Sequence, residues 1–409
     1  MEINNKLVSA VASFEKDMVR SLADMVRIPA ISPESGGEGE YDRGEFLVSL
    51  LKENGLTDIN RFDAPDRKAK RGLRPNIVAT LGKGKKSLWV ISHMDTVPVG
   101  DRKLWNHDPF DPLVRNGKLY GRGAEDNGQS LIASLYAARA VLEANLAPAV
   151  KIAFVSDEEL GSAKGIGYMA AQHAFSQGDE FLVPDSGNEK GDEIEIAEKS
   201  SLWARVRTTG RQTHASRPDS GINAGLAASR YMAFATDYLY AKYDARDPLF
   251  DPVQHSTFEP TKRLSNVENV NTIPGTDEFY FDCRILPSYS IAKVLSDMRN
   301  LAHIFGEQTG AKIAVDVFKK STAAEPTSRK SGIAMRTFEA VSELRGIEPH
   351  FVGIGGGTCA NIVRMRGFQA AVWSTECGMA HQPNEFSLVS NLAADAKVMA
   401  AIFSSMTAA

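Results

Sequence analysis

The stretch SLWVIS (87–92), followed by GQSLIASLYAARAVLEANLA (128–147) and VKIAFVS (150–156), decides the fold class of this chain of 409 residues. The first and third segments are short apolar runs, typical of buried strands. The middle segment has helical spacing and strong helix formers such as Ala and Leu. A strand, a helix and a strand in this order predict a parallel sheet with helices on its faces. We therefore expect an α/β domain of three layers around a mostly parallel sheet.

A second pattern begins near residue 200 and contains two alternating, strand-like segments, SLWARVRTTG (201–210) and DEFYFDCRIL (277–286). The six expected elements are a strand, a helix, two strands, a helix and a strand, at 201–210, 222–241, 264–270, 277–286, 290–310 and 311–318. This βαββαβ order indicates a ferredoxin-like α+β unit. After Ser321 the chain returns to segments of the first kind. We expect one domain from residues 1–198 and 322–409, with an inserted domain at 199–321.

Bulk properties limit the possible partners and compartment. The chain is too long for one ordinary core, which indicates two domains or one large domain with an insertion. The net charge of −4 gives no sign of a nucleic-acid or membrane partner. Cys283, Cys359 and Cys377 form no CxxC pair, which argues against a disulfide framework and favours a reducing, cytoplasmic compartment. The first 30 residues resemble an amphipathic helix rather than a signal peptide, and no segment is apolar enough to span a bilayer.

Polar residues follow both predicted strands, where parallel sheets bind their ligands. In SHMDTVP (92–98), His93 follows the first strand, and Asp95 is placed to orient its imidazole as a hydrogen-bond partner. The alternative is a structural histidine. In SDEELGS (156–162), three consecutive acids follow the second strand and repel one another. A solvated loop is one explanation, and a cation that relieves the repulsion is the other. In the second case one glutamate binds metal and its neighbour takes a proton from water.

Three further candidates have simple alternatives when each is taken alone. Asp126 in YGRGAEDNG (120–128) could cap a helix, with Glu125 beside it expected to be solvated. Asp185 could belong to a turn, and His381 could be a surface histidine. Together the candidates supply two histidines and at least three carboxylates. Such a set without cysteine is typical of zinc, cobalt or manganese sites, and an odd count suits two metals that share a carboxylate.

Five motifs occur in a familiar order along the chain, namely SHMDTVP, YGRGAEDN, SDEELGS, PDSG and GMAHQPNE. Jointly they resemble the family of co-catalytic zinc peptidases and deacylases that includes acetylornithine deacetylase, succinyl-diaminopimelate desuccinylase, aminoacylase and glutamate carboxypeptidase. The resemblance covers nearly the whole chain, and it includes GRQTHASRPDSGINA (210–224) and NTIPG (271–275) in the inserted domain. It implies a catalytic domain with an inserted lid that also forms a homodimer.

The resemblance implies two divalent metal ions, most simply zinc, with cobalt or manganese as alternatives. His93 and Asp185 would hold one ion. Glu159 and His381 would hold the other. Asp126 would bridge the two ions.

The same resemblance assigns the remaining roles. Glu158 would be the general base, and Asp95 would orient His93. His214, from the lid of either subunit, would polarise the scissile carbonyl. The residues expected to bind the substrate are Asn271, Arg284, Gly356, Gly357 and Thr358.

Two departures from the family pattern lie near the expected substrate surfaces. Gly128 and Gln129 stand where many members have Lys-Gly, and Cys359 stands where many have Asp. Neither change affects an expected ligand. The implied activity is hydrolysis of an amide bond in an N-acyl amino acid or short peptide with a free carboxylate. The alternatives are an exopeptidase or dipeptidase, or a non-catalytic binding protein of the same fold. No Gly-x-Ser-x-Gly motif points to a serine hydrolase.

Overall fold

The computed structural model describes residues 4–406 and divides into two compact units. The first unit contains the chain up to Ile196, Pro326–Phe351 and the residues from Thr358 onward; the second contains Ala197–Glu325 and Val352–Gly357. From the sequence we predicted an inserted domain at 199–321. No sequence pattern indicated that residues 352–357 would belong to the second unit. Both units combine helices with a β-sheet, so the expected α/β and α+β classes are confirmed.

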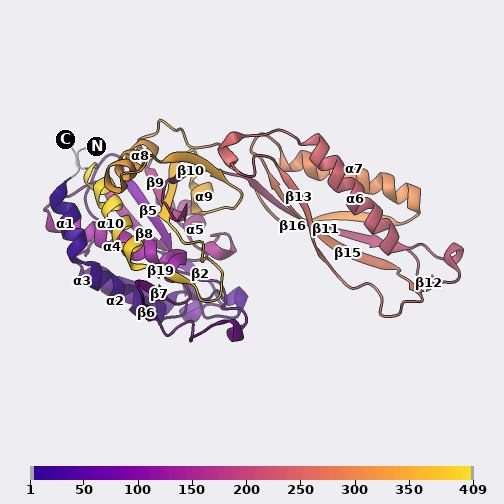
Figure 1. Ribbon diagram of the computed structural model, residues 1–409, viewed down its shortest axis with the longest axis horizontal. Helices are drawn as coiled ribbons and strands as arrows, with labels where there is room; N and C mark the ends of the chain where they lie inside the picture. The colour runs from indigo at the N-terminus through magenta and orange to yellow at the C-terminus, as the bar shows by residue number, and fades with distance from the viewer. Residues whose placement is uncertain (1–3, 407–409) are drawn as a thin grey trace. The chain divides into compact units, whose positions relative to one another are not determined.

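An eight-stranded sheet forms the centre of the first unit (Figure 1). Its strands, in spatial order, are β1 (Ile59–Arg61), β4 (Ile77–Thr80), β8 (Val150–Val155), β5 (Leu88–His93), β9 (Glu180–Asn188), β18 (Gln369–Thr375), β10 (Glu193–Glu198) and β17 (His350–Ile354). The four strands from β8 to β18 are parallel, whereas β1 pairs antiparallel with β4, β4 with β8, and β10 with β18. The sheet is mixed, with the expected parallel strands at its centre. Short loops reverse the chain after β4 and after β9, whereas parallel neighbours need a crossover connection.

Helices cover both faces of this sheet. They are α1 (Asn5–Ser13), α2 (Glu15–Val26), α3 (Tyr41–Glu53), α4 (Ser130–Glu143), α5 (Ile166–Ala171), α8 (Gly332–Arg345), α9 (Cys359–Arg364) and α10 (Val389–Ser404). α4 and α10 pack closely together, and Figure 1 shows them side by side. The helix expected at 128–147 is confirmed, and its Ala- and Leu-rich sequence is buried on almost every side. The strands expected at 87–92 and 150–156 are confirmed as β5 and β8.

β5 shows how the sheet positions a functional side chain. Trp89 and Ile91 belong to the apolar core that α5 and α9 cover, together with residues of β8, β9 and β18. Leu88 and Val90 are equally buried and point to the opposite face, because successive side chains of a strand alternate. His93 continues the series of Trp89 and Ile91, so the fold places its imidazole at the end of that face.

The second unit has the expected βαββαβ order. Its elements are β11 (Ser200–Thr209), β12 (Thr213–His214), α6 (Ala224–Lys242), β13 (Thr257–Arg263), β14 (Thr272–Ile273), β15 (Thr276–Ile285), α7 (Ile291–Thr309) and β16 (Lys312–Ser321). Four strands form an antiparallel sheet in the order β13, β15, β11, β16, and the apolar core beneath it is shared with α6 and α7 (Figure 1). The strand expected at 264–270 was wrong, because β13 lies at 257–263. β13 is an edge strand, which is where a strand tolerates a proline such as Pro260.

Two smaller features complete the architecture. β6 (Leu113–Arg115), β7 (Lys118–Tyr120) and β19 (Phe386–Leu388) form a three-stranded sheet, and β2 (Ala64–Pro65) pairs with β3 (Leu73–Arg74). Within residues 4–406, no helix has the length and apolar character needed to cross a membrane.

Candidate metal centre

The candidate ligands of the first unit meet at one edge of the central sheet. β8, β5 and β9 are parallel neighbours, so their carboxyl ends lie together. His93 is the last residue of β5, Glu158 and Glu159 follow β8 in a short turn, and Asp185 lies in the second half of β9. Asp126 enters from the loop before α4. Residues scattered over nearly 100 positions are thus brought to one place.

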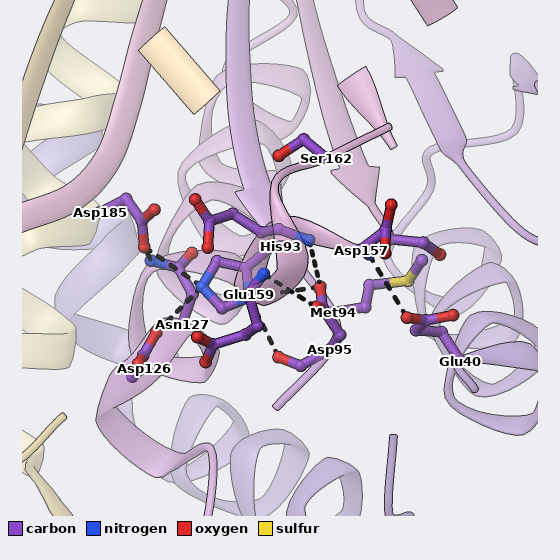
Figure 2. A network of polar contacts seen from close by, with 12 residues as sticks. Glu40, His93, Met94, Asp95, Asp126, Asn127, Asp157, Glu159, Ser162 and Asp185 are labelled. Atoms are coloured by element: carbon purple, nitrogen blue, oxygen red, sulfur yellow. Dashed lines mark hydrogen bonds and ion pairs between the residues drawn. The ribbon is translucent and has the colours of Figure 1, made fainter. Parts of the chain in front are cut away.

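His93 lies between two carboxylates. Its Nε2 is 2.9 Å from Oδ1 of Asp126 and 3.2 Å from Oδ1 of Asp185, and Figure 2 shows both carboxylates directed at the ring. The imidazole is 3% exposed. Burial disfavours its charged form, but the charge of Asp185 and the hydrogen bond with Asp126 outweigh burial and raise the pKa of His93. Asn127 donates to Oδ1 of Asp185 at 2.7 Å and helps to fix that carboxylate.

His381 contacts the other side of the same cluster. Its Nε2 is 3.2 Å from Oδ2 of Asp126 and 3.0 Å from Oε2 of Glu159. Hydrogen bonds with Asp126 and Glu159 raise the pKa of His381 to about 10. The two oxygens of Asp126 therefore face two different histidines. Burial opposes the ionised form of Asp126, but the hydrogen bonds with His381 and His93 prevail and lower its pKa.

The donor set fits divalent metal ions. One donor atom from each of His93, Glu158 and Asp185 lies within 4.8 Å of the others, and the same holds for His93, Asp126 and Glu159. Imidazole and carboxylate donors without thiolate suit zinc, cobalt or manganese. The buried Oε1 of Glu159 has no hydrogen-bond partner among residues 4–406. A buried carboxylate oxygen without a donor is costly, and a bound cation would remove that cost.

Glu158 occupies a distinctive position in the cluster. Its carboxylate belongs to the group formed with His93 and Asp185, yet its side chain is only partly buried. Burial and then the charge of Asp185 raise its pKa well above the ordinary value. A carboxylate with a raised pKa beside a candidate metal site can accept a proton and return it.

Asp95 is buried and contacts both His93 and the turn that carries the two glutamates. Its carboxylate accepts the main-chain N–H groups of Glu158 at 3.0 Å and Glu159 at 3.1 Å. Nδ1 of His93 is 3.0 Å from the main-chain carbonyl of Asp95 and 3.6 Å from its carboxylate. The carbonyl of Asp95 thus orients the ring, while the carboxylate holds the turn that carries both glutamates (Figure 2).

Sequence analysis missed two buried glutamates beside the cluster. Glu125 was expected to be solvated, and this was wrong: it is 3% exposed and accepts main-chain N–H groups of residues 377 and 379. Glu385 is fully buried and binds the loop that carries Asp126. Burial raises the pKa of Glu385 to about 7. The only available signal was the place of each glutamate close to a candidate ligand, at one residue before Asp126 and four after His381.

The second unit holds the expected lid residues His214 and Asn271. β12 and β14 pair so that His214 lies opposite Thr272, and the carbonyl of Asn271 accepts the N–H of Ala215. The exposed His214 receives a hydrogen bond from the main-chain N–H of Ser216 to Nδ1 at 3.1 Å. An N–H donor to Nδ1 requires the tautomer in which Nε2 carries the hydrogen of the neutral ring. Nε2 is thereby a hydrogen-bond donor.

The other expected substrate contacts are divided among three kinds of position. Arg284 on β15 forms a two-point ion pair with Asp282 and donates to the carbonyl of Gly355 at 3.0 Å. Gly356 and Gly357 are exposed in the second unit. Thr358, which belongs to the first unit, caps α9 by accepting the N–H of Ala360. Cys359 lies in the apolar core, as expected for a small buried residue.

A paired-histidine and carboxylate cluster at the edge of an α/β sheet defines a class of metal-dependent hydrolases. The model of peptidase family M20/M25/M40 matches residues 89–405, and the chain belongs to this family. The expected family is therefore confirmed, and the protein is a metallohydrolase that acts on amide bonds.

Relatives support this assignment, and solved structures share the fold. An uncharacterized metallohydrolase of Methanococcus maripaludis is 37% identical, and the match covers 92% of this chain and 96% of that protein. A succinyl-diaminopimelate desuccinylase of Gluconacetobacter diazotrophicus is 28% identical over 82% of this chain and 83% of the relative. The structure of the di-peptidase Dug1p from Saccharomyces cerevisiae superposes with a TM-score of 0.76, at 16% identity and 98% coverage of both chains. The carboxypeptidase Sso-CP2 from Sulfolobus solfataricus gives a TM-score of 0.73, at 18% identity, with 95% of this chain and 98% of that one covered.

Proposed function

We propose that the protein hydrolyses the amide bond of an N-acyl amino acid or short peptide that has a free carboxylate. The observation that carries the proposal is the position of Asp126, whose two oxygens face His93 and His381 separately. A carboxylate shared by two histidine-containing groups suits a pair of metal ions. His93 and Asp185 would hold one ion, and Glu159 and His381 the other. When bound, the ions lower the pKa of water and polarise the scissile carbonyl.

Glu158 is the proposed general base. Its carboxylate lies with His93 and Asp185 in one of the two candidate ligand groups, and its pKa is raised. It takes a proton from the attacking water and delivers it to the nitrogen of the leaving amine. Asp95 accepts the main-chain N–H of Glu158 and so fixes the turn from which this carboxylate projects.

The second unit supplies the proposed substrate contacts. His214 donates through Nε2 to the carbonyl oxygen as negative charge develops there, which is the role of an oxyanion donor. Arg284 uses Nε and Nη2 for Asp282, which holds its guanidinium in a fixed plane, and its remaining Nη hydrogens are the proposed donors to a substrate carboxylate. Asn271, Gly356 and Gly357 complete the proposed contacts. Whether His214 acts in its own subunit or in the partner of a homodimer stays a prediction, as does a cytoplasmic location.

The choice between deacylase and dipeptidase depends on the substrate's amino end. The relative named succinyl-diaminopimelate desuccinylase supports an N-acyl substrate. The similar fold of the di-peptidase Dug1p leaves a dipeptide with a free amino end as the alternative substrate. A panel of N-acetyl and N-succinyl amino acids and of dipeptides, free or blocked at the amino end, separates the two. We expect hydrolysis of the N-acyl compounds. Cleavage of free dipeptides alone would assign a dipeptidase instead.

Metal removal tests the central claim. Dialysis against a chelator is expected to abolish hydrolysis, and added zinc, cobalt or manganese is expected to restore it. Activity that is indifferent to the chelator would disprove the proposed chemistry. A metal-loaded protein that cleaves nothing in the whole panel would favour the binding-protein alternative.

A further inference from the structure

Two buried glutamates outside the proposed ligand set connect the loops that carry Asp126 and His381. Glu125 immediately precedes Asp126, and Glu385 follows His381 by four residues. Although the loops are about 250 residues apart in sequence, each glutamate reaches the main chain of the opposite loop. The arrangement is therefore reciprocal.

Glu125 binds the loop that leads to His381. One carboxylate oxygen accepts the N–H of Cys377 at 2.5 Å, and the other accepts the N–H of Met379 at 2.5 Å. These donors precede His381 by four and two residues. Both oxygens of Glu125 are thus engaged by the same short segment.

Glu385 binds the loop of Asp126 in the opposite direction. Its Oε1 accepts the N–H groups of Glu125 at 3.0 Å and Asp126 at 3.1 Å. Its Oε2 accepts the N–H of Gly123 at 3.0 Å and Nη1 of Arg122 at 2.7 Å. Main-chain donors to an ionised carboxylate are strong and directional.

His381 has a special need for such support. Its side chain is 57% exposed, so packing does not fix it. Its backbone has a φ of +64°, in the left-handed region. Residues other than glycine keep this conformation only when the surrounding structure stabilises it. The anchored N–H groups of Cys377 and Met379 supply that stabilisation.

We propose that Glu125 and Glu385 act as a reciprocal clamp that sets the position of His381 relative to Asp126 and thereby the affinity for metal. The inference rests on the ligand assignment of the proposed function. Both glutamates are positioning residues, because their carboxylate oxygens accept main-chain N–H groups of the opposite loop. Glu125 supports only the loop of His381, so it governs the ion held by Glu159 and His381. Glu385 supports Asp126, which serves both ions, so it governs both affinities.

The test is a cobalt titration of the metal-free, full-length protein, followed by calorimetry and by the visible absorption of bound cobalt. Glu125→Gln keeps the size of the side chain but turns an NH2 group toward a main-chain donor. It is expected to weaken one of two binding events by about 10–100-fold and leave the other unchanged. His381→Ala identifies the affected event by removing it. In the His381→Ala background, Glu125→Gln is expected to have no further effect. Glu385→Gln is expected to weaken both events.

Two further variants separate positioning from general loss of stability. Glu195→Gln disrupts a comparable buried ion pair with Arg364 and is expected to leave both cobalt events unchanged. Glu125→Asp keeps both acceptor oxygens and is expected to recover part of the lost affinity. If Glu125→Gln binds both ions like the parent, the clamp is refuted while the proposed function stands. If the parent binds no cobalt, the ligand assignment fails and the clamp fails with it.

Discussion

Replacing Asp95 by asparagine should weaken zinc binding in addition to lowering the stability of the fold. The carboxylate accepts the N–H groups of Glu158 and Glu159 at 3.0 and 3.1 Å and is almost fully buried. Asparagine has one acceptor oxygen, so one of the two N–H groups would face an NH2 group. A buried donor without a partner costs about 1–3 kcal/mol. If this cost destabilises the metal-bound state and not the metal-free state, the affinity for zinc becomes roughly 5–150-fold weaker. Loss of a hydrogen-bond partner behind metal ligands typically weakens affinity about 10–100-fold, which agrees with this range.

The measurement is competition for zinc against a chromophoric chelator, together with thermal unfolding of the metal-free protein. Asp179→Asn is a matched control at the opposite end of β5. Asp179 is also buried and accepts hydrogen bonds from Ser87 at 2.8 Å and Trp89 at 2.7 Å. Both variants should unfold at a lower temperature, but only Asp95→Asn should lose zinc affinity. An unchanged affinity in Asp95→Asn, or an equal loss in both variants, would refute the reasoning.

Three further changes have defined outcomes. Glu158→Gln should lower kcat about 10²–10⁴-fold with both metals retained, and a loss of bound zinc by elemental analysis would show that Glu158 is a ligand instead. His214→Ala should lower kcat about 10²–10³-fold without altering zinc affinity, since the candidate ligands all lie in the first unit; a change in KM alone would argue against an oxyanion role. Burial raises the pKa of Asp395 to about 6, above the usual value near 4. The folded protein therefore binds this proton more tightly than the unfolded chain does. The resulting stabilisation is present at low pH and is lost as the pH rises from about 4 to 6. Relative to Asp395→Asn, the parent should therefore lose up to about 3 kcal/mol across that interval in denaturant unfolding, and a flat difference would contradict the shift.

The central sheet and the candidate ligands could be predicted because their signals are local. The apolar runs of β5 and β8 indicate buried strands, and the polar residues directly after them must then lie at the sheet edge. These local signals predict where His93 and the glutamates after β8 lie, whereas their roles as ligand and base come from the family resemblance. The same local pattern located the helices and most of the strands in the second unit.

The features that were missed depend on contacts distant in sequence. The local sequence around Glu125 predicts a solvated side chain. Its burial is explained by hydrogen bonds from the main-chain N–H groups of residues 377 and 379. The role of the Asp95 carboxylate depended on how the turn after β8 folds back toward β5. The residues 352–357 join the second unit through tertiary contacts such as that of Arg284 with Gly355, which composition does not reveal.

The position of β18 has a consequence for the order in which the protein matures. β18 lies between β9 and β10, although 170 residues separate it from β10 in the chain. During synthesis, β9 and β10 therefore emerge with unpaired edges and must wait for β18 to join them. Four of the five proposed ligands leave the ribosome in the same early stretch, and only His381 follows β18. β18 and the last ligand therefore emerge at nearly the same time. Insertion of β18 should make the nascent chain resistant to proteolysis, and His381 should let it bind a second ion at the same late stage. Proteolysis and metal binding of chains from which only residues before β18, or all residues through His381, have emerged would test this coupling.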